Sequence, residues 1–274
     1  MRFWILLLIT TGLGAQQKFI SLDRYTDLPL SVYDSIGKVN TLLIGEIYGT
    51  NECPAIANAF VDLYLKKGKK VILALELPMQ EQSYVEAFLK SNDSMVFKKS
   101  LFFNNTHDGR TGRAMVNLIR NQAAKKDVRV MSYVNAKTPT TPREQDSLIA
   151  VNILKLRNQY PDEIIVLLAG NLHIRTKQGF KPGMETMGYY LKKELGDALL
   201  SVSIRFQRGK CFEKRNGKSQ LYELAEDTSH YKFYLTGESY LLIDPGFEEL
   251  GYQGIIYLRE ATPSFPYAGI TEAK

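Results

Sequence analysis

Continuous apolar runs alternate along this chain with stretches of helical periodicity. Residues 41–45, 71–75 and 164–169 are apolar almost without interruption, which is typical of strands buried on both faces of a sheet. Residues 128–133 and 199–206 predict two more strands. Five buried strands are therefore expected before residue 207.

Apolar residues between these runs recur at the spacing of one helical face. Ala57, Phe60 and Tyr64 share such a face, and Gly68 fits a helix end. Residues 91–110 read as irregular. The same periodicity predicts helices over residues 54–67, 80–90, 111–126, 143–159 and 183–195.

Alternating strands and helices predict an α/β fold, with a mostly parallel sheet flanked by helices on both faces. After Gly209 the pattern changes to short segments rich in Tyr and Phe, such as 231–235 and 254–258. We interpret these as extra short strands at the C-terminal end of one α/β domain that spans residues 16–274.

Composition excludes several protein classes. The 274 residues are 45% hydrophobic and 23% charged, which excludes a disordered tail and a collagen-like fibre. The body of the sequence holds no 18-residue apolar stretch, so no stable membrane span is expected. The net charge of +6 is interleaved with Asp and Glu, which favours a solvated surface over a nucleic-acid groove. The expected partner is a small-molecule or peptide substrate.

The N-terminus has the charged, apolar, small-residue order of a secretory signal peptide. Arg2 precedes an apolar run, and small residues end at Ala15, so we expect export to the periplasm or beyond and a mature chain from near Gln16. An exported protein permits a disulfide, but Cys53 and Cys211 alone do not predict one. The sequence has no CxxC or HExxH pattern, which argues against a structural zinc site.

Polar side chains follow four of the predicted strands, and parallel strands end together at one edge of a sheet. A carboxylate that closes a buried apolar run is costly unless it is paired or takes part in chemistry. Neutral imidazole accepts a proton near pH 7, and a neighbouring carboxylate raises its basicity. These residues are Glu46, Tyr48 and Asn51 after the first strand, Glu76 after the second, Tyr133 after the third, and Asn171 and His173 after the fourth.

Structural roles are the alternatives for the same side chains. Either glutamate could form an ion pair with Arg110 or Arg143, and His173 could be a hydrogen-bonded structural residue. Arg110 follows Gly109 in a turn before a predicted helix, where it could reach a ligand or belong to an ordinary helix cap.

Two further positions have both a chemical and a structural interpretation. Arg143 and Asp146 lie three residues apart in the first turn of a helix, so Arg143 could hold a substrate carboxylate or carbonyl group, or pair locally with Asp146. Cys53 precedes Pro54 at a helix start, where a thiolate is favoured. A Cys53–His173 nucleophilic pair is therefore the alternative to a small buried thiol.

Several of these motifs resemble a known superfamily. The run from Gly45 to Glu52, GEIYGTNE, resembles the GE-x-HGT-x-E opening of the erythromycin esterase, ChaN and Tiki/TraB superfamily. Leu75-Glu76-Leu77-Pro78 is similar to its second carboxylate strand, and Gly170-Asn171-Leu172-His173 to its second G-x-x-H motif. Residues 254–258 resemble a closing strand of the esterase-like members, so the likeness runs from about residue 41 to residue 263.

The resemblance implies an α/β fold with a site built from two Glu and two His. The superfamily includes esterases that hydrolyse a macrolide lactone, metal-dependent proteases and haem-binding proteins. By resemblance, Glu46, Glu76 and His173 are the site residues. This sequence departs at Tyr48, which stands where the family has its first His. A tyrosine with its ordinary pKa of about 10 is no base at neutral pH, but it can donate to an oxyanion or ligate iron.

Three hypotheses follow. In the first, the protein is an exported hydrolase of an ester or amide bond. One glutamate orients His173 or shares a divalent metal with it, with Glu46, Glu76 and His173 as candidate ligands. Tyr48 or Arg143 then steadies the oxyanion, and the expected substrate-binding residues are Tyr48, Asn51, Arg110, Arg143 and Asn171. In the second, Tyr48 or His173 ligates haem or another iron species. In the third, the chain keeps the fold but lost catalysis with the family's first His.

Overall fold

The computed structural model describes residues 17–36, 39–105, 109–135, 141–179, 185–215, 217–224 and 238–267. The expected signal peptide, residues 1–15, and the expected short segment 231–235 lie outside the described residues. Among the residues described, no helix is both long and apolar enough to cross a membrane.

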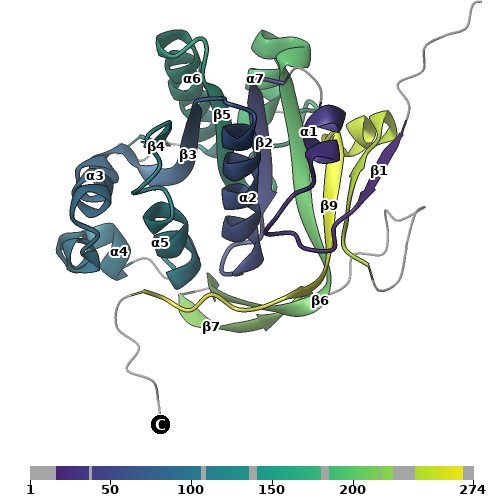
Figure 1. Ribbon diagram of the computed structural model, residues 1–274. Coiled ribbons are helices and arrows are strands. Elements are labelled where there is room, and N and C mark those ends of the chain that lie inside the picture. Colours follow the sequence, from purple (N-terminus) through teal and green to yellow (C-terminus); the bar gives the residue numbers. More distant parts are fainter. Residues whose placement is uncertain are drawn as a thin grey trace, which may run out of the picture.

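A nine-stranded sheet, with the order β1-β8-β9-β6-β2-β5-β3-β4 and with β7 paired to β6, forms the centre of the molecule (Figure 1). The strands from β9 to β4 in this order run parallel, and β1, β7 and β8 add antiparallel pairs. The strands are β1 Lys18–Ser21, β2 Thr41–Glu46, β3 Val71–Pro78, β4 Val128–Val134, β5 Ile164–Gly170, β6 Leu199–Arg215, β7 Lys218–Glu223, β8 Tyr240–Ile243 and β9 Gly254–Ala261.

Helices cover both faces of this sheet, as the alternating pattern predicts. Leu42 and Ile44 of β2 pack in one core with α1, α2, α3 and α5, whereas Leu43 packs in the other with α6 and α7. The mostly parallel α/β class is therefore confirmed. The helices are α1 Leu30–Ile36, α2 Glu52–Lys66, α3 Gln82–Ser91, α4 Leu101–Asn105, α5 Arg113–Arg120, α6 Pro142–Gln159 and α7 Met187–Leu195, with 3-10 turns at Met79–Glu81, Ser94–Lys99, Gly196–Ala198 and Pro245–Leu250.

Several predicted boundaries differ from the structure, and the helix expected from residue 183 begins only at Met187. The helix expected over 111–126 is only α5, because the chain then turns and the Gln122 side chain bonds the Leu118 carbonyl and Asn58 Oδ1. The strand expected to end at Phe206 continues to Arg215, since β7 pairs with its second half.

The stretch 91–110 is not irregular throughout. It contains Ser94–Lys99 and α4, which are joined by a stack of the Phe97 and Phe103 rings, with centroids 4.1 Å apart. The hydroxyl of Ser100 accepts a hydrogen bond from the Phe103 amide and so starts α4. Phe97 and Phe103 are six residues apart, which fits neither the helical nor the strand period, so the sequence pattern did not predict these elements.

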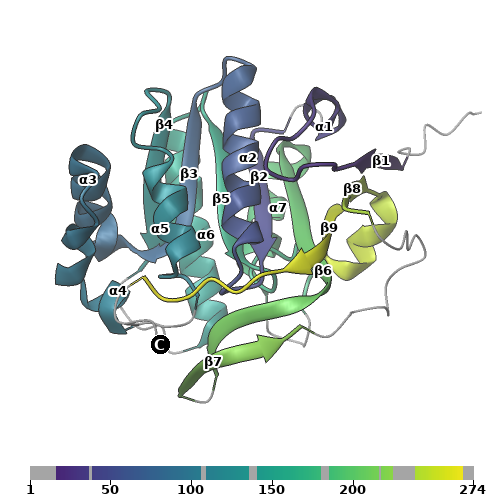
Figure 2. The ribbon, with the colours of Figure 1, turned by 60° about the horizontal axis from the view of Figure 1, so that its bottom comes forward.

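After β9 the chain crosses the sheet edge at which the parallel strands end. Figure 2 shows this final segment passing beneath α2 and α5. Isolated bridges join Thr50 to Pro263 and Gly112 to Pro266. The segment therefore contacts the loop before α2 and the loop before α5.

The central strand β5 should be the most sensitive part of the core. Leu167 is fully buried on the face that packs against α6 and α7. We expect Leu167→Ala to lower the free energy of unfolding by about 2–5 kcal/mol, because it leaves a cavity. Urea titration followed by circular dichroism measures this. The control Val151→Ala, at a 45% exposed position, should change it by less than about 1 kcal/mol.

Candidate functional site

The site lies where β2, β3 and β5 end side by side. Glu46, the last residue of β2, is opposite Gly170 of β5 in the parallel register. The Gly170 amide donates to Glu76 Oε2 at 3.0 Å, so the side chain that closes β3 reaches across to the end of β5. Both carboxylates are buried, each 4% exposed. The edge-of-sheet clustering expected from the sequence is therefore present for the two glutamates.

Glu76 is held by three donors from three segments. Besides the Gly170 amide, Tyr48 Oη donates to Oε2 at 2.7 Å and Arg110 donates to Oε1 at 3.2 Å. The Arg110 side chain is only 21% exposed, so this ion pair is shielded from water. The ion-pair alternative thus holds for Glu76, with Arg110 as its partner.

Arg110 lies between two aromatic rings. Its guanidinium carbon is 5.7 Å from the Tyr48 ring centroid and 5.5 Å from that of Phe102 in α4. Both distances suit cation–π contacts. Gly109, with φ of +91°, allows this approach, because a Cβ there would be 2.1 Å from the Gly49 amide nitrogen. The loop that carries Arg110 therefore rests directly on the loop that carries Tyr48.

Two tyrosines near the carboxylates remain phenols. Burial, together with the negative charges of Glu76 and Glu46, raises the pKa of Tyr48 well above its usual value. The same causes raise the pKa of Tyr133, whose hydroxyl donates to the Leu168 carbonyl at 3.2 Å. Tyr48 therefore acts as a hydrogen-bond donor. An iron–phenolate bond needs the deprotonated form, which these surroundings oppose, so the site does not fit haem ligation through Tyr48.

His173 pairs with a carboxylate from a different element than expected. Its Nδ1 lies 2.5 Å from Oδ1 of Asp146, a buried residue of α6. Burial alone lowers the pKa of His173, but the hydrogen bond to Asp146 and the charges of Glu76 and Asp146 outweigh it and raise that pKa to about 9. At neutral pH the side chain is therefore an imidazolium. The prediction that a glutamate orients His173 is wrong, because Asp146 occupies that position.

Arg143 does not belong to this cluster. Its side chain is 55% exposed and pairs with Glu185 at 2.7 Å, and its Nε donates to the Tyr190 hydroxyl at 3.3 Å. The local ion pair between Arg143 and Asp146 is therefore not formed. Asp146 faces the sheet, where it meets His173, whereas Arg143 lies on the exposed side of the same helix.

Two other predicted substrate-binding residues, Asn51 and Asn171, bond to backbone and side-chain groups of other segments. The side-chain amide of Asn51 donates to Thr262 Oγ1 at 3.0 Å and to the Pro263 carbonyl at 3.1 Å. The Asn171 amide donates to the Ile204 carbonyl at 3.2 Å and accepts from Ser203. Asn51 thus connects the loop before α2 to the residues after β9, and Asn171 connects the loop after β5 to the interior of β6. Substrate contact by either residue remains a prediction.

The structure disfavours the alternative in which Cys53 and His173 form a nucleophilic pair. Cys53 is completely buried, and burial, together with the charge of Glu46, raises the pKa of its thiol above the usual range. A thiolate nucleophile is therefore disfavoured here. Cys211 is also buried, and no disulfide joins the two residues in the described part of the chain.

Two contributors to the site had weak sequence signals. Phe102 lies in α4, which the hydrophobic pattern did not predict, and Asp146 was recognised only as a neighbour of Arg143. The available sequence signal for Asp146 was an Asp in the first turn of a predicted helix, on the face that carries the apolar residues. Within the described residues, no group of three or more His, Cys, Asp or Glu side chains is placed to hold a metal ion.

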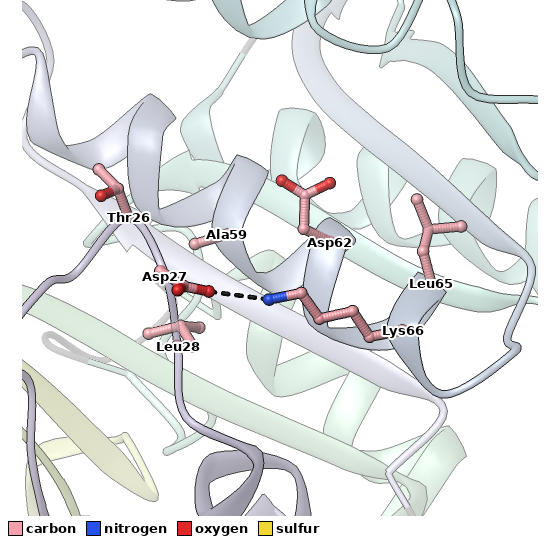
Figure 3. A pocket seen from close by; sticks show the side chains of 7 residues that line it. All are labelled: Thr26, Asp27, Leu28, Ala59, Asp62, Leu65 and Lys66. Atoms are coloured by element: carbon pink, nitrogen blue, oxygen red, sulfur yellow. Dashed lines mark hydrogen bonds and ion pairs between the residues drawn. The ribbon is translucent and has the colours of Figure 1, made fainter.

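Two hollows lie along the outer side of α2, apart from this cluster. One, of about 290 Å³, is lined by Asp27, Asp62 and Lys66 among others, and the Lys66–Asp27 ion pair spans it (Figure 3). The other, of about 450 Å³, lies between α2 and α5 and includes Asn58 and Asn117 in its lining. Neither hollow is lined by Glu46, Glu76 or His173.

The sequence profile described as erythromycin esterase matches residues 80–244, which is more than half of the chain. The match begins after Glu46, Tyr48 and Glu76 and includes Arg110 and His173. A search of curated proteins found no match.

Several solved structures share the fold at low sequence identity. A mutant of the erythromycin esterase EreC in its open conformation has a TM-score of 0.70 at 9% identity, over 92% of this chain and 100% of that one. A protein described as a succinoglycan biosynthesis protein gives 0.68 at 10% identity, over 89% and 95%. A Bacillus cereus protein gives 0.58 at 11%, over 90% and 96%. At such identities the likeness shows the fold.

The raised pKa of His173 should make stability depend on pH. The stabilisation is fully present below the unfolded pKa of 6.5 and is lost as pH rises to about 9. Its magnitude is at most about 3 kcal/mol. We expect the free energy of unfolding to fall across this window in the wild type and to stay flatter in His173→Gln, as measured by urea titration.

Asp62→Asn is the control, because it removes an ion pair with Lys125 far from the site. It should keep the wild-type slope. Parallel curves for wild type and His173→Gln would contradict the raised pKa.

Proposed function

Because the chain belongs to the erythromycin esterase family, we propose that it hydrolyses an ester bond at the edge where β2, β3 and β5 end. The observation that carries the proposal is the hydrogen bond between His173 Nδ1 and Asp146 Oδ1, which together with the charge of Glu76 favours the protonated imidazole. A half-buried cation together with buried carboxylates supplies the acid and the base that hydrolysis of an ester by water requires.

His173 takes the role of the acid in this proposal. With its pKa raised to about 9, it carries a proton at neutral pH. Asp146 occupies Nδ1, so the proton available for transfer is on Nε2. That N–H can polarise the ester carbonyl and then protonate the departing alkoxide.

The two glutamates have different surroundings and so different roles. Glu76 accepts from Tyr48, Arg110 and the Gly170 amide, so both of its oxygens are engaged and it serves as an anchor. Glu46 lies at the end of β2, which β5 separates from β3, and its charge acts on both Tyr48 and Tyr133. We assign the base to Glu46, which accepts the proton of the attacking water.

The proton balance closes within these groups. Glu46 removes one proton from water as the hydroxide oxygen bonds to the ester carbon. The tetrahedral intermediate collapses, the carbon–alkoxide bond breaks, and the alkoxide takes the Nε2 proton of His173. The proton on Glu46 then returns to His173 through solvent. The products are a carboxylic acid and an alcohol. Tyr48 takes no part in these proton transfers, because Glu46 accepts the proton of water and His173 donates the proton to the alkoxide.

Turnover of a panel of p-nitrophenyl and aliphatic esters tests the proposal. We expect His173→Gln and Glu46→Gln to lower kcat/KM by about 10²–10⁴-fold, the usual contribution of a general acid or base. Lys66→Ala, in the hollow of Figure 3, is the control and should retain wild-type activity. All variants are compared at equal folded fraction. A folded wild type that turns over no ester in the panel would favour the hypothesis that catalysis was lost.

The pH profile separates an acid from a base at His173. We expect kcat/KM to fall above pH about 9, because the imidazolium loses its proton there. A rate that instead rises through this range would assign His173 as the base and reject its role as acid.

We also propose that the protein is exported, on the basis of the N-terminal order of charged, apolar and small residues. Intact-mass measurement of the chain expressed with its N-terminus in a bacterial host should give a mature protein that begins near Gln16. A mass that retains residues 1–15 would contradict export by cleavage.

A further inference from the structure

Residues 262–267 form a strap that follows β9 and joins the two loops of the site. In Figures 1 and 2 it runs along the edge where the parallel strands end, beneath α2 and α5. We call this segment the C-terminal strap. Its contacts connect the end of β9 to the loop before α2 and to the loop before α5.

The first attachment is to the loop between β2 and α2. The backbone N–H of Asn51 donates to the Thr262 carbonyl at 2.9 Å, and the backbone N–H of Ser264 donates to the Gly49 carbonyl at 2.8 Å. Gly49 directly follows Tyr48 in the chain. The strap therefore fixes the backbone on the C-terminal side of Tyr48.

A buried carboxylate strengthens this attachment. Glu52 is 4% exposed and accepts the Thr262 hydroxyl at 2.6 Å and the Thr262 amide at 3.0 Å. Charge-assisted hydrogen bonds of this kind are about twice as strong as neutral ones. The hydroxyl of Thr262 also accepts from the Asn51 side chain at 3.0 Å. Thr262 is thus the best-connected residue of the strap.

The second attachment is to the loop that carries Arg110. The Arg113 amide donates to the Phe265 carbonyl at 2.8 Å, and the Ala114 amide donates to Ser264 Oγ at 3.0 Å. A Cβ at Gly112 would be 2.6 Å from Ser264 Oγ, so only glycine permits this approach. Ser264 therefore supplies an N-terminal cap for α5, and the strap holds the loop just after Arg110.

Tyr48 and Arg110 are the two side-chain donors to Glu76. Each lies within three residues of a backbone group that bonds the strap. The two loops also contact each other directly, where Gly109 meets Gly49 and where Arg110 lies over the Tyr48 ring. The position of both donors is therefore coupled to the same six residues.

We propose that Thr262 and Ser264 are positioning residues that set the geometry of Tyr48 and Arg110 around Glu76, so that the proposed hydrolysis depends on the strap. This inference rests on the proposed function for its catalytic consequence. Its geometric part stands independently, because it concerns how Arg110 reaches Glu76.

A purely structural strap predicts a different result, and the charges around His173 distinguish the two. The groups that act on His173 are Asp146 of α6, Glu76 of β3 and Arg110 of the loop before α5. The positive charge of Arg110 lowers the pKa of His173, whereas the two carboxylates raise it. If Arg110 moves away from Glu76, the pKa of His173 rises. A loss of stability alone leaves it unchanged.

The experiment compares Thr262→Val and Ser264→Ala with Thr262→Ser, which keeps the hydroxyl. The pKa of His173 is measured by NMR titration of the imidazole, with His173→Gln used to assign its signal. We expect Thr262→Val and Ser264→Ala to raise that pKa by about half a unit or more and Thr262→Ser to restore it. Ser91→Ala, which removes a hydroxyl bonded to the Ala87 carbonyl in α3, is the control for general destabilisation and should leave it unchanged.

Ester turnover by the same variants tests the catalytic part. We expect kcat to fall by about tenfold or more in Thr262→Val with a smaller change in KM, because misplaced groups lose transition-state contacts. A His173 pKa that is equal in all folded variants overturns the inference. Since the titration needs no substrate, this failure is distinct from a failure of the proposed function, in which the wild type itself hydrolyses no ester. If Thr262→Val does not fold, Ser264→Ala alone decides.

Discussion

The buried carboxylate of Glu76 is the group around which the site is organised. An ionised carboxylate taken out of water is costly unless its oxygens are fully hydrogen-bonded and its charge is balanced. Here the compensation comes from the end of β5, from the loop after β2 and from the loop before α5. Removing any one donor leaves a buried charge with too few partners, so these three segments must assemble together. The site therefore forms only in the folded protein, where all three segments are present together.

The charge on His173 depends first on its hydrogen bond to Asp146 and then on the same carboxylate of Glu76. Burial by itself favours neutral imidazole, but Glu76 and Asp146 together make the imidazolium the stable form at neutral pH. Asp146 provides the direct hydrogen bond and Glu76 provides a longer-range field. Two acidic residues from different elements, Glu76 of β3 and Asp146 of α6, thus both raise the pKa of His173. For the same reason Arg110, which neutralises part of the charge of Glu76, is a sensitive element of the arrangement.

The sequence predicted the strands and the edge where the site forms, because buried parallel strands have long apolar runs and end together. Glu46, Glu76 and His173 were found in this way. It could not predict Asp146 as the partner of His173, because the pairing joins residues 27 positions apart across a loop and a strand, and local spacing pointed instead to Arg143. Phe102 was missed for a related reason. The short helix α4 is held by aromatic stacking and one serine, and neither has a helical period.

The exchange of an expected His for Tyr48 follows the same physical logic. A second imidazole beside Glu76 would add another titrating group to a cluster that already holds His173, Arg110 and buried carboxylates. The phenol of Tyr48 donates one hydrogen bond, keeps its proton because burial and the two glutamates raise its pKa, and offers its ring face to Arg110. Its contribution is therefore constant across the physiological pH range. In the proposed hydrolysis Tyr48 therefore supplies a fixed hydrogen bond to Glu76, and the proton transfers are left to Glu46 and His173.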